Sequence, residues 1–398
     1  RVRIKDIRHE AVSQALQHSR SLFHKAVERR KLSRLDAARR VELVSGGIEY
    51  DGFGTLDLVM EAVVERMDVK RTVLAEVEAH LSPEAVLTSN TSTLSIDEMA
   101  EALQRPERFA GMHFFNPVHR MPLVEIVRGS RTDARTLATI HALALRMGKT
   151  PVVVRDGPGF LVNRVLAPYL NEAGHLLAEG ASVEEIDAVA RDFGMPMGPL
   201  RLIDEVGIDV SRHAGDVLHR AFGARLTPSA PLVALGESGR LGRKGGSGFY
   251  RYENGREKGV DPEVYAAMGA TVPATRVRIP AADIRGRLFL QMINEAARAL
   301  EDGIVASAGE ADLAMIMGTG FPPFRGGLFR FVDCEHPRTV MDRSRDLQER
   351  LGPRFAPAPL LVRLAEEERR FYEAFPAPAP TFPTGNRGDT TDQPALAE

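Results

Sequence analysis

The sequence has very little cysteine: Cys334 is the only one in 398 residues. A single thiol excludes an intrachain disulfide and a cysteine metal cluster, and it fits a reducing compartment. We therefore expect a protein of a cell interior, with a bacterial cytosol favoured over a mitochondrial matrix.

The chain also lacks an excess of either charge and lacks long apolar runs. Lys and Arg total 52 against 54 for Asp and Glu, a net charge of −2 that argues against a nucleic-acid-binding surface. No run approaches the ~18 apolar residues of a membrane span, so no integral membrane contact is expected. With 43% apolar and 27% charged residues, the composition is that of a globular protein of two or three domains that binds small molecules.

Two further features are missing at the start of the chain. It opens at Arg1 without Met or a signal-like segment, so the sequence looks cut into. The run RVRIKDI reads as a strand that ends at Asp6, where a dinucleotide-binding fold places the acid that binds the adenosine ribose. By itself, Asp6 is more often explained as an ordinary N-cap of the following helix. The G-x-G-x-x-G turn precedes such an acid by about 20 residues and would lie upstream.

Alternating strand and helix patterns predict a parallel sheet in the first 155 residues. The run 56–65 is apolar enough for a strand buried on both faces, and helical spacing covers residues 10–40. Ligands of such sheets bind at the carboxyl ends of the strands, where Ser89 to Ser92 fall. The remaining predicted strands span 86–90, 109–115, 123–127 and 151–154, and the predicted helices span 68–81 and 133–147.

Helical patterns replace this rhythm from Asp156 onward, which predicts an α/β plus all-α protein. Ser182 and Glu185 form a capping box at one predicted helix start. The segment that begins at Asn171 recurs at Asn294, which predicts two helical units that pair through their apolar faces. The expected parts are a nucleotide-binding domain at 1–155, helical units at 156–255 and 282–370, a linker at 256–281, and a disordered tail at 371–398.

Four polar residues suggest a dehydrogenase chemistry. His113 has the ordinary pKa range of a general base, and Glu125 on the next predicted strand can orient it. Ser92 and Asn163 can hydrogen-bond the reacting oxygen. Each also has a structural explanation, as a core histidine, a strand-end charge or a helix cap. The sequence shows no clustered metal ligands, no Ser-His-Asp order and no phosphate loop that would indicate another chemistry.

Several motifs resemble the L-3-hydroxyacyl-CoA dehydrogenase family. More narrowly, they resemble the dehydrogenase portion of the multifunctional fatty-acid oxidation complex α-subunit. The resemblance covers nearly the whole chain, from Asp6 to about Val362. The motifs are SNTSTL from Ser89, GMHFFNPV from Gly111, LVEIV from Leu123, DGPGFLVNR from Asp156, and GMPMGP from Gly194 with DEVGID from Asp204.

This resemblance implies roles for individual residues. His113 would be the catalytic base paired with Glu125, and Ser92 and Asn163 would contact substrate. The fold it implies is a Rossmann-type NAD-binding domain, incomplete at its start, followed by two repeated helical C-terminal domains. The NAD contacts it implies are Asp6, Val63, Val64, Glu65, Lys70, Ser92 and Asn116, with Lys244 reaching across from the helical part.

The implied function is NAD-dependent oxidation of (3S)-3-hydroxyacyl-CoA in fatty-acid β-oxidation. A thiolase subunit and an upstream enoyl-CoA hydratase domain are the implied partners. Two alternatives stay open: a non-catalytic module with an incomplete nucleotide site, and a 3-hydroxybutyryl-CoA dehydrogenase working reductively with NADPH. Asp6 opposes the second, because a carboxylate repels a 2′-phosphate. A basic run either meets the phosphates of CoA or is a solvated helix face; it comprises Arg29, Arg30, Lys31 and Arg34.

Overall fold

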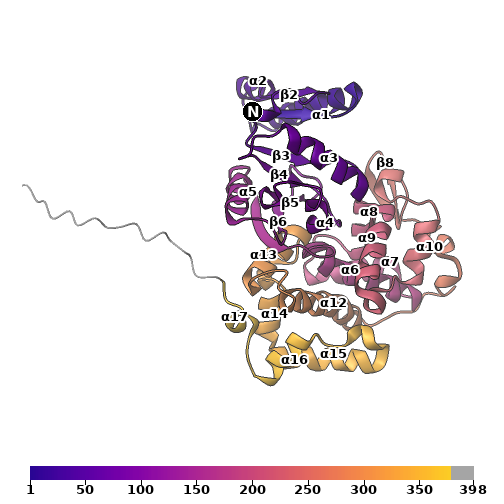
Figure 1. The fold of residues 1–398 in the computed structure, drawn as a ribbon. Helices are drawn as coiled ribbons and strands as arrows, with labels where there is room; N and C mark the ends of the chain where they lie inside the picture. Colours follow the sequence, from indigo (N-terminus) through magenta and orange to yellow (C-terminus); the bar gives the residue numbers. More distant parts are fainter. Residues whose placement is uncertain (378–398) are drawn as a thin grey trace, which may run out of the picture.

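The computed structural model describes residues 1–377, and it divides into an α/β part and a helical part as predicted. Figure 1 shows a small lobe with β2, α1 and α2 at the top and the larger sheet below it. The helical part lies to the right of this sheet and beneath it. Within the described residues, no helix combines the length and apolarity that crossing a membrane requires.

The larger sheet has five strands in the order β3-β4-β5-β6-β7. All neighbours are parallel except β5 and β6, so the prediction of a fully parallel sheet is wrong at this pair. The connection 115–122 is shorter than the dozen or more residues of a parallel crossover. The strands are Leu58–Glu61, Val86–Ser89, Phe109–Phe114, Leu123–Arg128 and Thr150–Arg155, and the helices are α3 (Met67–His80), α4 (Ile96–Ala100) and α5 (Ala134–Arg146).

The first strand of this sheet is shorter and more exposed than the sequence predicts. β3 covers only four residues of the predicted run 56–65, and only Glu61 in it is fully buried. β3 has a hydrogen-bonded neighbour on one side only, which leaves its other edge open. Val63 and Val64 lie beyond the strand in a loop, with 37% and 62% exposure. A strand buried on both faces is therefore the wrong description of this segment.

The small lobe holds a parallel pair, β1 (Val2–Lys5) and β2 (Val44–Gly47), covered by two helices. The sequence pattern predicts one long helix over 10–40, but the structure has α1 (His9–Glu28) and α2 (Arg34–Glu42). Arg30 adopts a positive φ of 56° between them, and the Ser33 hydroxyl then accepts a hydrogen bond from the Asp36 N–H to cap α2. The left-handed residue and the new cap explain the break.

The helical part consists of two units in which five helices follow one another in the same order. The first unit contains α6 (Val162–Ala178), α7 (Val183–Phe193), α8 (Pro199–Val206), α9 (Ile208–Phe222) and α10 (Ala230–Glu237). The second contains α12 (Ala281–Glu301), α13 (Ala308–Thr319), α14 (Leu328–Glu335), α15 (Pro337–Leu351) and α16 (Pro359–Glu366).

Equivalent buried carboxylates hold equivalent helices in the two units. Asp187 accepts hydrogen bonds from the N–H groups of Leu200 and Arg201 at the start of α8. Asp312 accepts the same pair of bonds from Phe329 and Arg330 at the start of α14. The repeat that the sequence suggested is therefore a repeat of packing as well as of motif.

Two of the predicted boundaries need correction. The hairpin of β8 (Tyr250–Glu253) and β9 (Arg256–Val260) crosses residue 255, and α11 (Val264–Met268) packs on α10 within the predicted linker. Backbone pairing and buried side chains thus join these residues to the first unit. At the other end, α17 (Phe371–Ala374) follows α16 and buries Phe371 completely, so the predicted tail does not begin at 371. Residues 378–398 lie outside the described part.

Candidate active site

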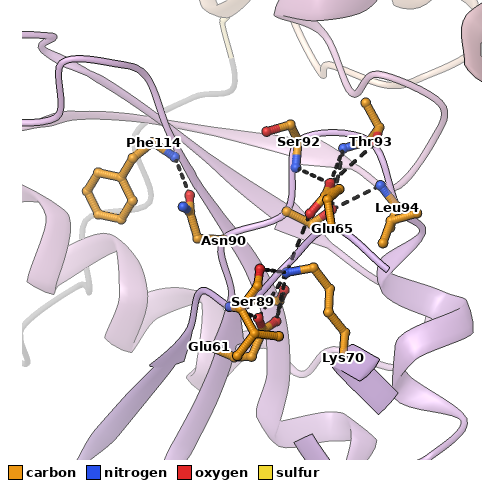
Figure 2. A network of polar contacts seen from close by, with 11 residues as sticks. Glu61, Glu65, Lys70, Ser89, Asn90, Ser92, Thr93, Leu94 and Phe114 are labelled. Atoms are coloured by element: carbon orange, nitrogen blue, oxygen red, sulfur yellow. Dashed lines mark hydrogen bonds and ion pairs between the residues drawn. The ribbon is translucent and has the colours of Figure 1, made fainter. Parts of the chain in front are cut away.

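The candidate site lies where the carboxyl ends of β3, β4 and β5 meet the start of α6. Figure 2 shows the loops after β3 and β4 joined by a network of polar contacts. Because strands of a sheet deliver their ends to a common edge, residues far apart in sequence converge here.

His113 and Glu125 form a buried pair across two neighbouring strands. The antiparallel register of β5 and β6 places the two residues directly opposite each other. His113 Nδ1 lies 2.7 Å from Glu125 Oε2, and the residues are 4% and 0% exposed. The ring of His113 also packs against Phe115 and Phe160 at 4.5 and 5.7 Å between centroids. With Nδ1 engaged, Nε2 is the atom that can exchange a proton with a ligand.

The second oxygen of Glu125 faces the helical part. Oε1 accepts hydrogen bonds from the N–H groups of Leu161 and Val162 at 3.1 and 2.9 Å, at the start of α6. The amino terminus of a helix favours a negative charge, and these N–H groups otherwise lack partners. Glu125 therefore connects the sheet to α6 and presents a negative charge to His113.

Asn163 contacts the loop that carries Ser92. Asn163 sits in the first turn of α6, and its Nδ2 donates to the backbone oxygen of Ser92 at 3.2 Å. Ser92 itself belongs to the loop after β4 and is exposed. The two polar side chains thus come from opposite sides of the junction between the two parts.

Glu65 organises the loop that carries Ser92. Its Oε1 accepts bonds from Thr91 Oγ1 at 2.6 Å, the Ser92 N–H at 2.9 Å and the Thr93 N–H at 3.2 Å (Figure 2). Burial by itself raises the pKa of Glu65, but these bonds and the charge of Lys70 outweigh burial, so the pKa is lowered from 4.5. Glu65 is thus a negatively charged residue that shapes this loop.

Sequence reasoning missed Glu61, which lies under the same loop. Glu61 Oε1 accepts from Lys70 Nζ at 2.9 Å and from the Val63 N–H at 2.6 Å, and Oε2 accepts from Ser89 Oγ at 2.6 Å. Lys70 and Ser89 are completely buried and Glu61 is 4% exposed. The available signal was a carboxylate inside the apolar run LVMEAVV, nine positions before a lysine.

The remaining predicted cofactor residues lie at three places: after β1, after β5 and on the helical part. Asp6 follows β1 and is half-buried; its Oδ1 accepts from the Arg8 N–H at 3.0 Å, and Arg8, not Asp6, is the N-cap of α1. Asn116 is exposed just after β5. Lys244 lies elsewhere, on the helical part, where its Nζ binds Asp209 Oδ2 at 2.7 Å. A carboxylate after one strand and polar groups after others are the donors and acceptors that a dinucleotide needs.

Comparison with known families covers both parts of the chain. Residues 1–157 match the 3-hydroxyacyl-CoA dehydrogenase NAD binding domain. Residues 159–252 and 284–372 both match the 3-hydroxyacyl-CoA dehydrogenase C-terminal domain, which agrees with the two helical units.

Individual relatives agree with the family matches. The chain is 42% identical to the fatty acid oxidation complex subunit alpha of Vibrio vulnificus over 372 residues, which is 94% of this chain and 52% of that protein. It spans about half the length of the curated relatives it matches.

Two solved structures of 3-hydroxybutyryl-CoA dehydrogenases also match this chain. The 3-hydroxybutyryl-CoA dehydrogenase of Escherichia coli matches with a TM-score of 0.80 and 29% identity, over 92% of this chain and 93% of that one. The (S)-3-hydroxybutyryl-CoA dehydrogenase of Ralstonia eutropha matches with a TM-score of 0.61 and 37% identity, over 64% and 90%. With its paired His113 and Glu125, its strand-end loops and its duplicated helical unit, this chain belongs to the 3-hydroxyacyl-CoA dehydrogenase family.

Proposed function

We propose that the chain carries out the NAD-dependent oxidation of (3S)-3-hydroxyacyl-CoA to 3-oxoacyl-CoA. The observation that carries the proposal is the buried pair of His113 and Glu125, set beside Ser92 and Asn163 at the carboxyl edge of the sheet. A general base with an orienting carboxylate, next to hydrogen-bonding groups, is the arrangement that alcohol oxidation requires.

In this mechanism His113 Nε2 takes the proton from the substrate hydroxyl. Glu125 keeps Nδ1 protonated and stabilises the imidazolium that forms, because its charge lies 2.7 Å away in a buried site. Asn163 and Ser92 hold the substrate oxygens in place. When bound, NAD supplies the acceptor for the hydride that leaves C3.

The proposed NAD contacts follow the strand ends. Asp6 would bind the adenosine ribose hydroxyls, and its charge favours NAD over NADPH because it repels a 2′-phosphate. The loop 63–65 and Ser92 would meet the nicotinamide half, with Asn116 after β5. Lys70 is completely buried, so it would support the NAD site indirectly, by holding the carboxylates of Glu61 and Glu65 in place. Lys244 stays a prediction, since its ammonium pairs with Asp209 in this structure.

Several positively charged residues of α1, the segment after it and the loop after β5 are the candidates for binding the CoA that carries the acyl group. His119 follows the strand of the catalytic base, and burial together with the positive charges of Arg120, His18, Arg29 and Lys25 lowers its pKa. The end of α1 and the loop after β5 thus share one positive field. We propose that this field, with Arg30, Lys31 and Arg34, binds the phosphates of CoA.

The partners and the compartment are proposed from the relatives. Those relatives are alpha subunits of fatty acid oxidation complexes from Vibrio species, and this chain spans about half of their length. We infer a place in the β-oxidation of a bacterial cytosol, with a hydratase domain upstream and a thiolase subunit as partner.

One second function has support from a specific observation. Two of the matching solved structures are 3-hydroxybutyryl-CoA dehydrogenases, which favours a short acyl chain and allows the reductive direction. Comparing NADH with NADPH in the reduction of acetoacetyl-CoA separates this candidate from the oxidative one.

The test is NADH formation from NAD and (S)-3-hydroxybutyryl-CoA, with the full chain and with His113→Gln. Loss of the base should lower kcat by roughly two to four decades. NAD affinity, measured by calorimetry, should stay unchanged, and His141→Gln on α5 serves as the control. Near-normal turnover by His113→Gln would contradict the mechanism, and wild-type protein that binds no NAD would favour the non-catalytic module.

A further inference from the structure

Glu295 is a buried carboxylate of the second helical unit that reaches into the first unit. Its side chain is 2% exposed, and its Oε1 accepts from Arg164 Nε at 2.7 Å and from an Arg225 guanidinium N–H at 3.2 Å. Arg164 lies on α6 and Arg225 just after α9, so both arginines belong to the first unit. Such a paired charge in a dry environment holds its partners in a fixed geometry.

Arg164 connects this contact to the candidate active site. It immediately follows Asn163 in the first turn of α6, the turn at which Leu161 and Val162 donate to Glu125. Its second contact is also with the second unit, because the guanidinium donates to Asp302 Oδ2 at 2.6 Å. The side chain of Arg164 is only 3% exposed, so its position is set by these carboxylates.

The molecule contains the same contact a second time, without an active-site residue beside it. Glu172 of the first unit accepts from Arg287 Nε at 2.7 Å and from Arg354 Nε at 2.9 Å. Arg287 also binds Glu179, as Arg164 binds Asp302. The residue before Arg287 is Gly286, and a Cβ added there would meet no atom within 4 Å. Only the Arg164 contact therefore adjoins a side chain that can meet substrate.

We propose that Glu295 is a positioning residue for Asn163, so that the second helical unit sets the geometry of the substrate site in the first. The inference rests on the proposed function. Glu295 holds the Arg164 side chain, the Arg164 backbone fixes the first turn of α6, and this turn aims the Asn163 amide at the substrate oxygen. A small displacement of such a group is costly, because the interaction depends on alignment.

The test compares Glu295→Gln with its internal equivalent Glu172→Gln in the full chain. Each change removes one buried charge from the same kind of contact, so both should lower the melting temperature to a similar extent. Only Glu295→Gln should raise the KM for (S)-3-hydroxybutyryl-CoA, by about tenfold, with the KM for NAD unchanged. Equal acyl-CoA KM values for the two variants would overturn the inference, whereas an inactive wild type would instead overturn the proposed function.

A milder pair covers the case in which the buried variants do not fold. Asp302→Asn and Glu179→Gln change the outer carboxylates of the two contacts, whose side chains are 54% and 40% exposed. The acyl-CoA KM should rise for Asp302→Asn alone, and equal values again count against the proposal.

A double variant tests whether the effect passes through Asn163. In an Asn163→Ala background, Glu295→Gln should change the acyl-CoA KM less than twofold, because the group it positions is gone. A full additional tenfold rise in that background would show independent action and would reject the positioning role.

Discussion

At the scale of single residues, Glu125 divides its two oxygens between the sheet and the helical part. Oε2 binds His113, and Oε1 binds the first N–H groups of α6. A buried histidine with a carboxylate partner is also common in inert cores, so the pair alone does not identify a site. Two neighbouring features accompany the pair: Asn163 lies near it in the first turn of α6, and the Asn163 amide contacts the loop of Ser92.

Glu65 gives a pH prediction at the same scale. The pKa of Glu65 is lowered from 4.5 in the folded chain. As the pH falls below 4.5, the unfolded chain therefore takes up a proton at Glu65 before the folded chain does. The stability that Glu65 contributes is thus present above pH 4.5 and is lost as the pH falls through its lowered pKa. A plot of melting temperature against pH has an acid limb, in which the melting temperature falls as the pH drops below 4.5. Glu65→Gln should make this limb less steep. Glu366→Gln, exposed on α16, is the control, and an unchanged limb in Glu65→Gln would contradict the assignment.

At the scale of elements, the start of α7 follows directly from its sequence. The Ser182 hydroxyl accepts from the Glu185 N–H at 3.2 Å, and the Glu185 carboxylate accepts from the Ser182 N–H at 3.2 Å. This is the capping box that the residue types predict, and it satisfies two N–H groups at the helix start. The box forms from residues three apart, so no distant contact was needed to foresee it.

The contribution of this capping box to the free energy of unfolding can be measured. Ser182→Ala removes the hydroxyl acceptor and should lower the free energy of unfolding by about 1 kcal/mol, measured by urea denaturation. Ser13→Ala is the matched control, because Ser13 is exposed inside α1 and caps nothing. Equal stability of the two variants would show that the cap contributes nothing.

At the scale of the whole molecule, α6 and α12 pair in a way that resembles a two-fold symmetric interface. Arg164 of α6 binds Glu295 of α12, and Arg287 of α12 binds Glu172 of α6. In symmetric dimers each contact occurs twice in this reciprocal manner. The two helical units therefore pack on each other through a reciprocal, pseudo-two-fold contact within the chain.

This pairing predicts a large effect of one arginine. Arg287→Ala leaves Glu172 buried with Arg354 as its one remaining ion-pair partner among residues 1–377, and should cost about 3 kcal/mol of the free energy of unfolding. Arg350→Ala also removes two ion pairs, with Asp283 and Asp346, but these are solvent-exposed and should cost under about 1 kcal/mol. Denaturant unfolding of both variants measures the difference. Similar losses of stability would contradict a special role of the buried contact between Arg287 and Glu172.

Local pattern determined much of this protein. The change from an α/β to a helical pattern near Asp156, the capping box at Ser182 and the repeat that begins at Asn171 and Asn294 all appear in the structure, because each is visible in short segments of the chain. The family motifs also identified His113 and Glu125 as a pair before their register was known.

Tertiary structure decided what depends on distant neighbours. It made β3 a half-exposed edge strand and set β6 antiparallel, since strand order and direction are not written in any one segment. It buried Glu61 under Lys70, and it brought Glu295 to Arg164 across 131 positions of the chain. Charges like these look like surface residues in the sequence, and only the packing around them shows which are buried and paired.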